Sequence, residues 1–166
     1  MLGLSEERIT QILEGIDSIT TDEKEKALLA ALASAQEYRA VFDCSSSNPR
    51  YILSRFNLIE KTMQMIEAHG DTVRFAVTMH GGCAKVASES ADCLAPEEEV
   101  LYVKKAQESL ERLSKAKTVE LVVCAIALEG NGIDREDVLP YLRISENSYL
   151  DTIAYQNRGY ALMPLK

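Results

Sequence analysis

Strand-like and helix-like segments alternate through most of this chain, and this alternation restricts it to a small group of folds. Apolar residues favour short strands over residues 38–44, 73–79 and 119–124. Between them, residues 52–66 and 97–115 repeat apolar positions every three or four residues, which is typical of amphipathic helices. Alternation of this kind is characteristic of a mainly parallel sheet covered by helices on both faces. The sequence therefore predicts an α/β fold.

The remaining segments extend the same pattern to the end of the chain. After the strand that ends at Cys124, we expect a Gly-rich loop and a short helix beyond Asp134. The other short elements are predicted as a helix over residues 84–88, a weak strand over 141–144, a helix from Ser145 to Gln156, and a strand over 159–163 that Pro164 ends.

The first 36 residues differ from the rest because they predict only helices. One short amphipathic helix begins near Ser5, and a second begins at Thr21 or Asp22. The apolar stripe of the second helix must pack on its own domain or on another subunit, and the sequence leaves both open. We therefore predict an N-terminal helical extension, residues 1–36, before a single domain, residues 37–166.

Charge and composition exclude several classes of function. The net charge of −8 opposes binding to nucleic acid, which depends on clustered Lys and Arg. No segment has the run of about 18 apolar residues that a membrane span requires. The first residues lack the basic stretch and apolar core of a signal peptide. Four cysteines without a CxxC pair do not resemble a secreted disulfide framework, so we expect a cytoplasmic protein with free thiols.

Chemically versatile side chains follow each of the first three predicted strands. Cys44 ends the first, His80 and Cys83 follow the second, and Cys124 ends the third. If these strands are parallel neighbours, the four side chains meet at one edge of the sheet, where α/β proteins place their sites. Cys124 can equally be a buried cysteine that only packs, because free cysteine is among the most buried residue types.

The segment from His80 to Cys83 leaves two interpretations open. The amides at Gly81 and Gly82 can form an anion-binding nest that shifts a nearby thiol toward thiolate. Alternatively, the glycines only permit a tight turn, and Cys83 packs in the core. His80 is either a hydrogen-bonded histidine at a strand end or a general base and thiolate partner.

Other chemistries receive little support from the sequence. A zinc site built from the three strand-end cysteines and His80 would lack the closely spaced ligand pairs of structural zinc modules, so we predict no metal. There is no GxSxG, GxxxxGK or GxGxxG motif, which disfavours hydrolases and nucleotide-dependent enzymes and predicts no cofactor. Cys93 lies in an irregular region and is either incidental or a resolving thiol.

Several of these segments, taken in order, resemble one family of small proteins. They are the first strand with its following Asp and Pro, Val77 to Gly82, Val122 to Cys124, Gly130 to Asp134, and Tyr155 to Ala161. Together they cover roughly residues 38–164 and resemble the DsrE/DsrF-like (YchN-like) family of sulfur-relay proteins.

The resemblance implies both a fold and a chemistry. It implies a three-layer α/β/α fold with a five-stranded, mainly parallel sheet, and assembly as a homo-oligomer, commonly a trimer or hexamer. In members of the DsrE type, a cysteine just after the third core strand carries persulfide sulfur between donor and acceptor proteins, without a cofactor. Cys124 is similar to that position. Among its expected neighbours, His80 is a candidate helper of the thiolate, and Cys83 or Cys44 is a candidate second sulfur site.

Three functional hypotheses follow. The first is a sulfur carrier or sulfurtransferase that uses Cys124, His80 and Cys83. The second is a non-catalytic oligomeric protein that binds a small ligand or a partner in the same crevice, while the cysteines only pack. The third is a redox sensor with a Cys83–Cys124 disulfide, which requires Cα atoms within about 7 Å of each other.

Overall fold

The computed structural model of this 166-residue chain describes residues 7, 9, 10 and 21–166. It divides into two compact units. One comprises Met1–Tyr38 and Lys61–Arg74, and the other comprises Arg39–Glu60 and Phe75–Lys166. The candidate site lies within the second, larger unit.

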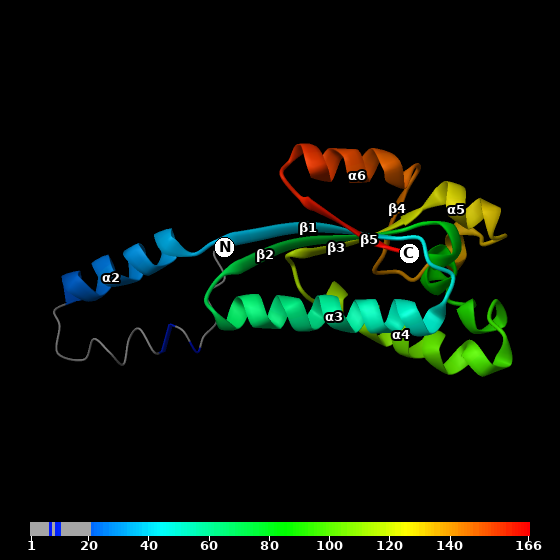
Figure 1. The fold of residues 1–166 in the computed structure, drawn as a ribbon, viewed down its shortest axis with the longest axis horizontal. Coiled ribbons are helices and arrows are strands. Elements are labelled where there is room, and N and C mark those ends of the chain that lie inside the picture. The colour runs from blue at the N-terminus through cyan, green and yellow to red at the C-terminus, as the bar shows by residue number, and fades with distance from the viewer. Residues whose placement is uncertain (1–6, 8, 11–20) are drawn as a thin grey trace. The chain divides into compact units, whose positions relative to one another are not determined.

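Five parallel strands form one sheet in the order β4-β3-β2-β1-β5 (Figure 1). The strands are β1 (Glu37–Cys44), β2 (Thr72–Met79), β3 (Val119–Cys124), β4 (Arg143–Ser145) and β5 (Ala161–Leu165). In the sheet register Met79 lies beside Val123, and Cys124 lies beside Ser145. The carboxyl ends of β1, β2 and β3 therefore meet at one edge of the sheet, and this prediction is confirmed.

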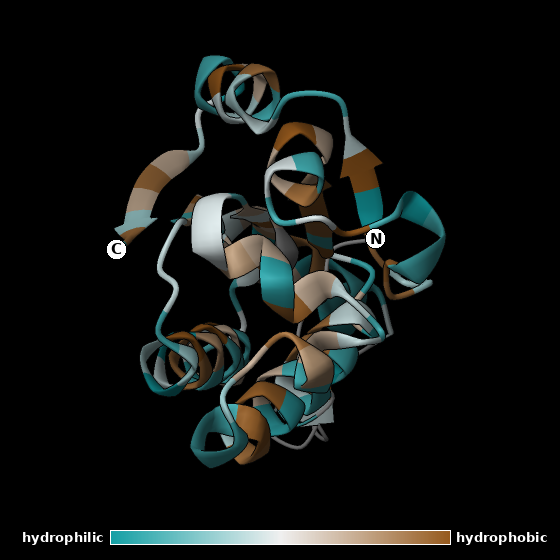
Figure 2. Cartoon of the chain, turned by 90° about the vertical axis from the view of Figure 1, so that its right-hand side faces the viewer, coloured by the Kyte–Doolittle hydropathy of each residue, from teal (hydrophilic) through white to brown (hydrophobic). Residues whose placement is uncertain are grey.

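Helices cover both faces of the sheet and complete the three-layer α/β/α fold. Figure 1 shows α3 (Pro49–Ala68) and α4 (Val100–Ser114) on one face, and α5 (Ala125–Gly130) and α6 (Ser148–Asn157) on the other. Figure 2 shows hydrophobic and hydrophilic residues alternating around individual helices, the pattern expected of elements with one side against a core. Short 3₁₀ helices complete the set: η1 (Gly81–Ala87), η2 (Ala91–Cys93), η3 (Glu97–Glu99) and η4 (Arg135–Asp137).

The central strands are buried along most of their length. In β2, every residue except Arg74 is buried, and in β3 every residue except Glu120. A strand covered on both faces shows such continuous burial instead of alternation. On the α6 side of the sheet, Val41, Ala76 and Tyr155 form a buried cluster.

Two sequence predictions near the site were wrong. The loop expected after Cys124 is a helix, α5, that begins at Ala125 without a connection. Ala125 to Leu128 contain strong helix formers, which outweigh the glycines that follow at Gly130 and Gly132. The short helix expected after Asp134 is only the single 3₁₀ turn η4.

The last strand also differs from its prediction. It begins at Ala161 and continues through Pro164, which lies beside Asp43 in the register. β5 is an edge strand, and an edge strand tolerates a proline because its missing N–H can face away from the ladder. Gly159, expected to start the strand, instead occupies the preceding turn with a φ of 84°.

The smaller unit contains α2 (Thr21–Ser34), which confirms the second of the predicted N-terminal helices. The first, predicted to begin near Ser5, lies outside the described residues except for positions 7, 9 and 10. Within this unit the Thr72 N–H donates to the Gln36 carbonyl, and the Gln36 N–H donates to the Asp71 carboxylate. Across residues 7, 9, 10 and 21–166, no helix is both long and apolar enough to cross a membrane.

Candidate functional site

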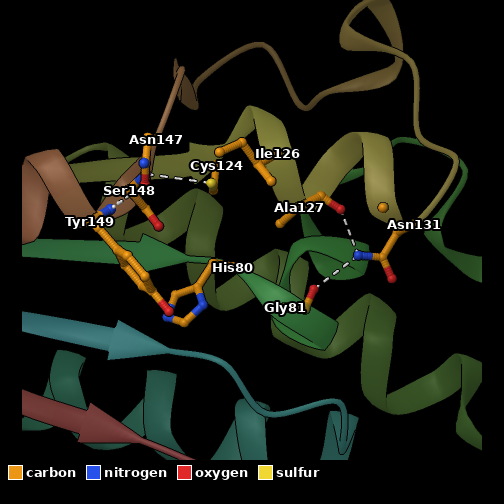
Figure 3. A pocket seen from close by; sticks show the side chains of 10 residues that line it. His80, Gly81, Cys124, Ile126, Ala127, Asn131, Asn147, Ser148 and Tyr149 are labelled. Carbon is orange, nitrogen blue, oxygen red and sulfur yellow. Dashed lines mark hydrogen bonds between the residues drawn. The ribbon is translucent and has the colours of Figure 1, made fainter.

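A pocket of about 440 Å³ opens at the carboxyl edge of the sheet (Figure 3). Its walls come from the ends of β2 and β3, from α5, and from the turn between β4 and α6. The lining residues are His80, Gly81, Cys124, Ile126, Ala127, Gly130, Asn131, Asn147, Ser148 and Tyr149. A pocket of this size is within the range that holds small ligands or an inserted side chain. Two of the three predicted site residues, Cys124 and His80, therefore share one cavity.

Cys124 occupies the last position of β3 and is also the N-cap residue of α5. Its backbone is extended, with a φ of −80° and a ψ of 123°, as expected of an N-cap. The Ser148 N–H, the first amide of α6, donates a hydrogen bond to Cys124 Sγ at 3.4 Å, drawn as a dashed line in Figure 3. The sulfur therefore lies where two helices begin.

This environment favours the thiolate. Burial of Cys124 acts to raise the thiol pKa, but hydrogen bonds from Ser148 and from the Ala127 and Ile126 amides outweigh it. The pKa of Cys124 consequently lies below its ordinary value of 9.0. Helix N-terminal amides stabilise negative charge, which is the physical cause of such shifts at reactive cysteines. The thiol is free, although its residue is only 5% exposed.

His80 lies across the pocket from Cys124 and is held by a carboxylate. Its Nε2 lies 3.1 Å from Asp43 Oδ1, the same oxygen that accepts a hydrogen bond from Thr78 Oγ1 at 2.8 Å. The Asp43 hydrogen bond raises the pKa of His80 above 6.5, against burial, and the negative charge of Cys124 adds to the increase. The imidazole therefore keeps its proton to a higher pH than an unperturbed histidine does.

The sequence did not predict several residues that shape this pocket. Asp43 lies within the strand predicted over residues 38–44 and was given no role in the site, although an acid beside a strand end is a signal that could have identified it. The Tyr149 ring meets the His80 ring edge to face, with centroids 5.8 Å apart. Asn131 Nδ2 donates to the carbonyls of Gly81 and Ala127 and so ties α5 to the turn after β2. The Ser148 amide is a main-chain group, which no residue pattern could reveal.

Cys83, the third predicted site residue, lies elsewhere. It is fully buried and forms a disulfide with Cys44, their Cα atoms 5.9 Å apart, within the range for such a bond. The expectation of free thiols was therefore wrong for this pair. Cys83 lines no part of the pocket and is not paired with Cys124, as the redox-sensor hypothesis requires. Cys93 is free and exposed, and it lies outside the pocket.

The two glycines after His80 have specific steric roles. Gly81 has a φ of 51°, a conformation that L-residues rarely adopt. A Cβ at Gly82 would lie 2.7 Å from the Cα of Ser47, so the turn can approach the segment after β1 only with glycine there. The Cys83 N–H donates to the His80 carbonyl at 3.1 Å and is used within the turn. This geometry supports the tight-turn interpretation of the glycines.

The part of the chain that the structure describes contains no set of side chains that could form a metal centre. There, no three side chains of His, Cys, Asp or Glu form a group that could hold a metal ion. Two of the four ligands considered from the sequence, Cys44 and Cys83, are joined to each other.

Known proteins match most of this chain. An uncharacterized protein of Aquifex aeolicus (strain VF5) is 32% identical over 130 residues, which is 78% of this chain and 57% of that relative. The chain thus spans just over half the length of this relative. The solved structure of MTH1491, a protein of unknown function from Methanobacterium thermoautotrophicum, has a TM-score of 0.60 and 17% identity. It covers 76% of this chain and 98% of its own, and it supports the fold alone.

A model of the DsrE/DsrF-like family matches residues 16–165, nearly the whole chain. This match includes the strand ends that form the pocket. The chain belongs to the DsrE/DsrF-like family.

Proposed function

We propose that this protein is a sulfur carrier, in which the Cys124 thiolate accepts a sulfane sulfur atom and passes it to an acceptor thiol. The observation that carries the proposal is the position of Cys124 Sγ, which lines a pocket and accepts a main-chain N–H from Ser148. Membership of the DsrE/DsrF-like family supports sulfur relay in general terms.

The proposed transfer balances without an added oxidant, reductant or cofactor. The Cys124 thiolate attacks the outer sulfur of a donor persulfide, the donor S–S bond breaks, and the donor leaves as a thiolate. Cys124 then carries the persulfide. An acceptor thiolate attacks the outer sulfur of that persulfide, and Cys124 leaves as a thiolate again.

His80 has a defined part in this cycle. Asp43 raises the pKa of the imidazole, and in the proposed cycle the ring carries a proton that pairs with the Cys124 thiolate. The same proton can pass to a departing thiolate when the S–S bond breaks. His80 thus acts as a counter-ion and proton donor, with Asp43 holding the ring. The sulfur of Cys83 is bonded to that of Cys44 and is not a free thiol, so we assign the sulfur-carrying step to Cys124 alone.

Sulfur donor and acceptor proteins are the proposed partners. Around the pocket, Ile126 and Tyr149 are large apolar side chains that are 58% and 64% exposed. Exposed apolar groups beside a pocket favour contact with another protein. A partner cysteine that enters the pocket would meet the Cys124 sulfur directly.

Sulfur loading tests the proposal. The starting protein carries Cys93→Ser, which leaves Cys124 as the single free thiol beside the Cys44–Cys83 disulfide. After exposure to thiosulfate or polysulfide, intact mass spectrometry should show a gain of one sulfur atom. The matched protein that also carries Cys124→Ser should show none. Circular dichroism confirms that both are folded.

The same experiment separates the carrier from a non-catalytic binding protein, for which the pocket volume is the supporting observation. A pure binding protein would leave Cys124 unmodified while folded. It would also bind its ligand equally well with Cys124→Ser. Two outcomes would contradict the sulfur-carrier proposal. In one, the folded Cys93→Ser protein gains no mass after exposure to the sulfur donor. In the other, it gains the same mass whether or not Cys124 is present.

We also propose assembly as a homo-oligomer, a trimer or hexamer, in the cytoplasm. Leu162 and Met163 on the edge strand β5 are exposed, as is Leu29 on α2, and these apolar side chains support contact between copies. In this proposal residues 1–36 are an extension that contributes to assembly beside the domain of residues 37–166. Light scattering on the full chain tests it, and a monomer at high concentration would contradict it.

A further inference from the structure

The turn between β4 and α6 supplies the amide that meets the Cys124 sulfur. The first three amides of α6 have separate partners. The Ser148 N–H donates to Cys124 Sγ, the Tyr149 N–H donates to Asn147 Oδ1, and the Leu150 N–H donates to the Asn147 carbonyl. The side chain of Asn147, the N-cap residue, thus accepts the Tyr149 N–H of its own helix, and the Ser148 N–H is available to the sulfur.

One carboxylate connects this first turn of α6 to the strand that precedes it. Asp151 Oδ1 accepts a hydrogen bond from Arg143 Nη2 at 2.6 Å, and Asp151 Oδ2 accepts one from Ser145 Oγ. Arg143 and Ser145 are both on β4, two residues apart, and so point to the same face of the sheet. The side chain of Asp151 is only 15% exposed. Its pKa is lowered, because these two hydrogen bonds outweigh its burial, so the group is an anion at neutral pH.

These contacts form a closed series of interactions that begins and ends at Cys124. Cys124 lies beside Ser145 in the sheet register, and Ser145 donates to Asp151. Asp151 is one helical turn after Ser148, whose amide returns to Cys124 Sγ. A shift of α6 along β4 would therefore break the Asp151 contacts and move the Ser148 amide from the sulfur at the same time.

We propose that Asp151 is a positioning residue for Cys124, because its carboxylate ties α6 to Arg143 and Ser145 and so holds the Ser148 amide on the sulfur. This inference rests on the proposed function for its biological meaning. Asp151 does not line the pocket and does not touch the sulfur. Its effect passes through the main chain of α6.

A carboxylate in the first turn of a helix could instead serve only to stabilise that helix. The two roles differ in what they do to the thiol. If Asp151 only stabilises the helix, Asp151→Ala lowers the unfolding free energy and leaves the reactivity of Cys124 in the folded protein unchanged. A positioning role changes that reactivity.

The test measures the rate of Cys124 alkylation by iodoacetamide against pH, in protein that carries Cys93→Ser and is not reduced. Adding Asp151→Ala should raise the pH midpoint and lower the rate near neutral pH about tenfold, the scale of one hydrogen bond to a charged group. His80 and Tyr149 are the ionisable side chains that line the pocket with Cys124, and both are unchanged in every variant. Ser145→Ala should shift the midpoint in the same direction by less, because Arg143 still holds the carboxylate.

The control is Glu146→Gln, in the same turn. Glu146 forms a two-bond ion pair with Arg135, at 2.8 Å for each bond, but is 78% exposed and outside the pocket. Its loss should leave the alkylation profile unchanged. If Asp151→Ala does not fold, Asp151→Asn and Ser145→Ala replace it. Folded variants with the midpoint of the parent protein would overturn the proposal.

This measurement stays informative if the sulfur-carrier proposal fails. Alkylation reports the ionisation of Cys124 whether or not the thiol accepts sulfane sulfur. A shifted midpoint in a protein that cannot be loaded with sulfur would support the role of Asp151 and contradict the carrier. If the parent protein is loaded with sulfur but the Asp151 variants keep its midpoint, the result would support the carrier and contradict the role of Asp151.

Discussion

Two cysteine sites lie at the same edge of the same sheet, and they differ in bonding, in hydrogen-bond partners and in access to a pocket. Cys124 ends β3, is free, and meets the first amides of two helices beside a pocket. Cys44 ends β1 and is bonded to Cys83, with both residues fully buried. A strand-end position therefore brings a cysteine to the edge where α/β proteins place their sites, but its neighbours decide whether the sulfur stays free or forms a disulfide.

The neighbours also differ in how closely the backbone packs. On the Cys83 side, a Cβ at Gly82 would collide with Ser47, whereas a Cβ at Gly130 in the pocket wall would meet nothing within 4 Å. The tightly packed side holds the disulfide, and the open side holds the free thiol. We therefore propose that the disulfide stabilises the fold and that Cys124 carries the chemistry.

Removing the disulfide should have the largest effect on stability. The double variant Cys44→Ala, Cys83→Ala should lower the unfolding free energy by about 3–4 kcal/mol, since the bond closes a loop between residues 39 apart in sequence. Alanine is used because a serine hydroxyl would be buried at these positions. Urea denaturation measures the change. Sulfur loading of Cys124, measured on the folded fraction, should be retained.

Cys93→Ser is the control for this comparison, because Cys93 is exposed and free. It should leave the urea midpoint unchanged. A disulfide variant that keeps its stability but loses sulfur loading would assign the chemistry to Cys44 and Cys83 and contradict our division of roles.

The sequence was sufficient for the fold because the decisive signals are local. The apolar runs of β2 and β3 and the amphipathic repeats of α3 and α4 each specify an element without reference to the rest of the chain. The errors arose where two local signals competed. Helix-forming residues directly after Cys124 outweighed the later glycines, and the edge position of β5 allowed Pro164 within a strand.

The site was only partly predictable, for a physical reason. Strand ends placed Cys124 and His80 together, because parallel strands bring their carboxyl ends to one edge. The pairing of Cys44 with Cys83 depends on a distance across the fold, and the Ser148 amide carries no side-chain signature. Asp43 meets His80 only because β1 and β2 are neighbours.

The smaller expected effect concerns the Asp43–His80 pair, which links the two sites because Asp43 is adjacent to Cys44. The pKa of His80 is raised in the folded protein. Its contribution to stability is therefore complete below pH 6.5 and is lost as the pH rises through the pKa of the folded state. Burial opposes ionisation of Asp43, but the His80 and Thr78 hydrogen bonds outweigh it and lower the pKa. The contribution of Asp43 to stability is therefore present above pH 3.8 and is lost as the pH falls through the pKa of the folded state.

The pair should consequently stabilise the fold most between pH 3.8 and 6.5. Asp43→Asn should lower the unfolding free energy there by about 1–2 kcal/mol, as expected for a hydrogen bond between charged groups, and by less at alkaline pH. Urea denaturation at one pH within this range and one well above it measures both values. The control is Glu60→Gln, which breaks an ion pair with Arg112 that contains no histidine and should cost equally at both pH values. An equal loss for Asp43→Asn at both pH values would show that Asp43 does not raise the pKa of His80, and it would contradict the protonated ring that the proposed transfer uses.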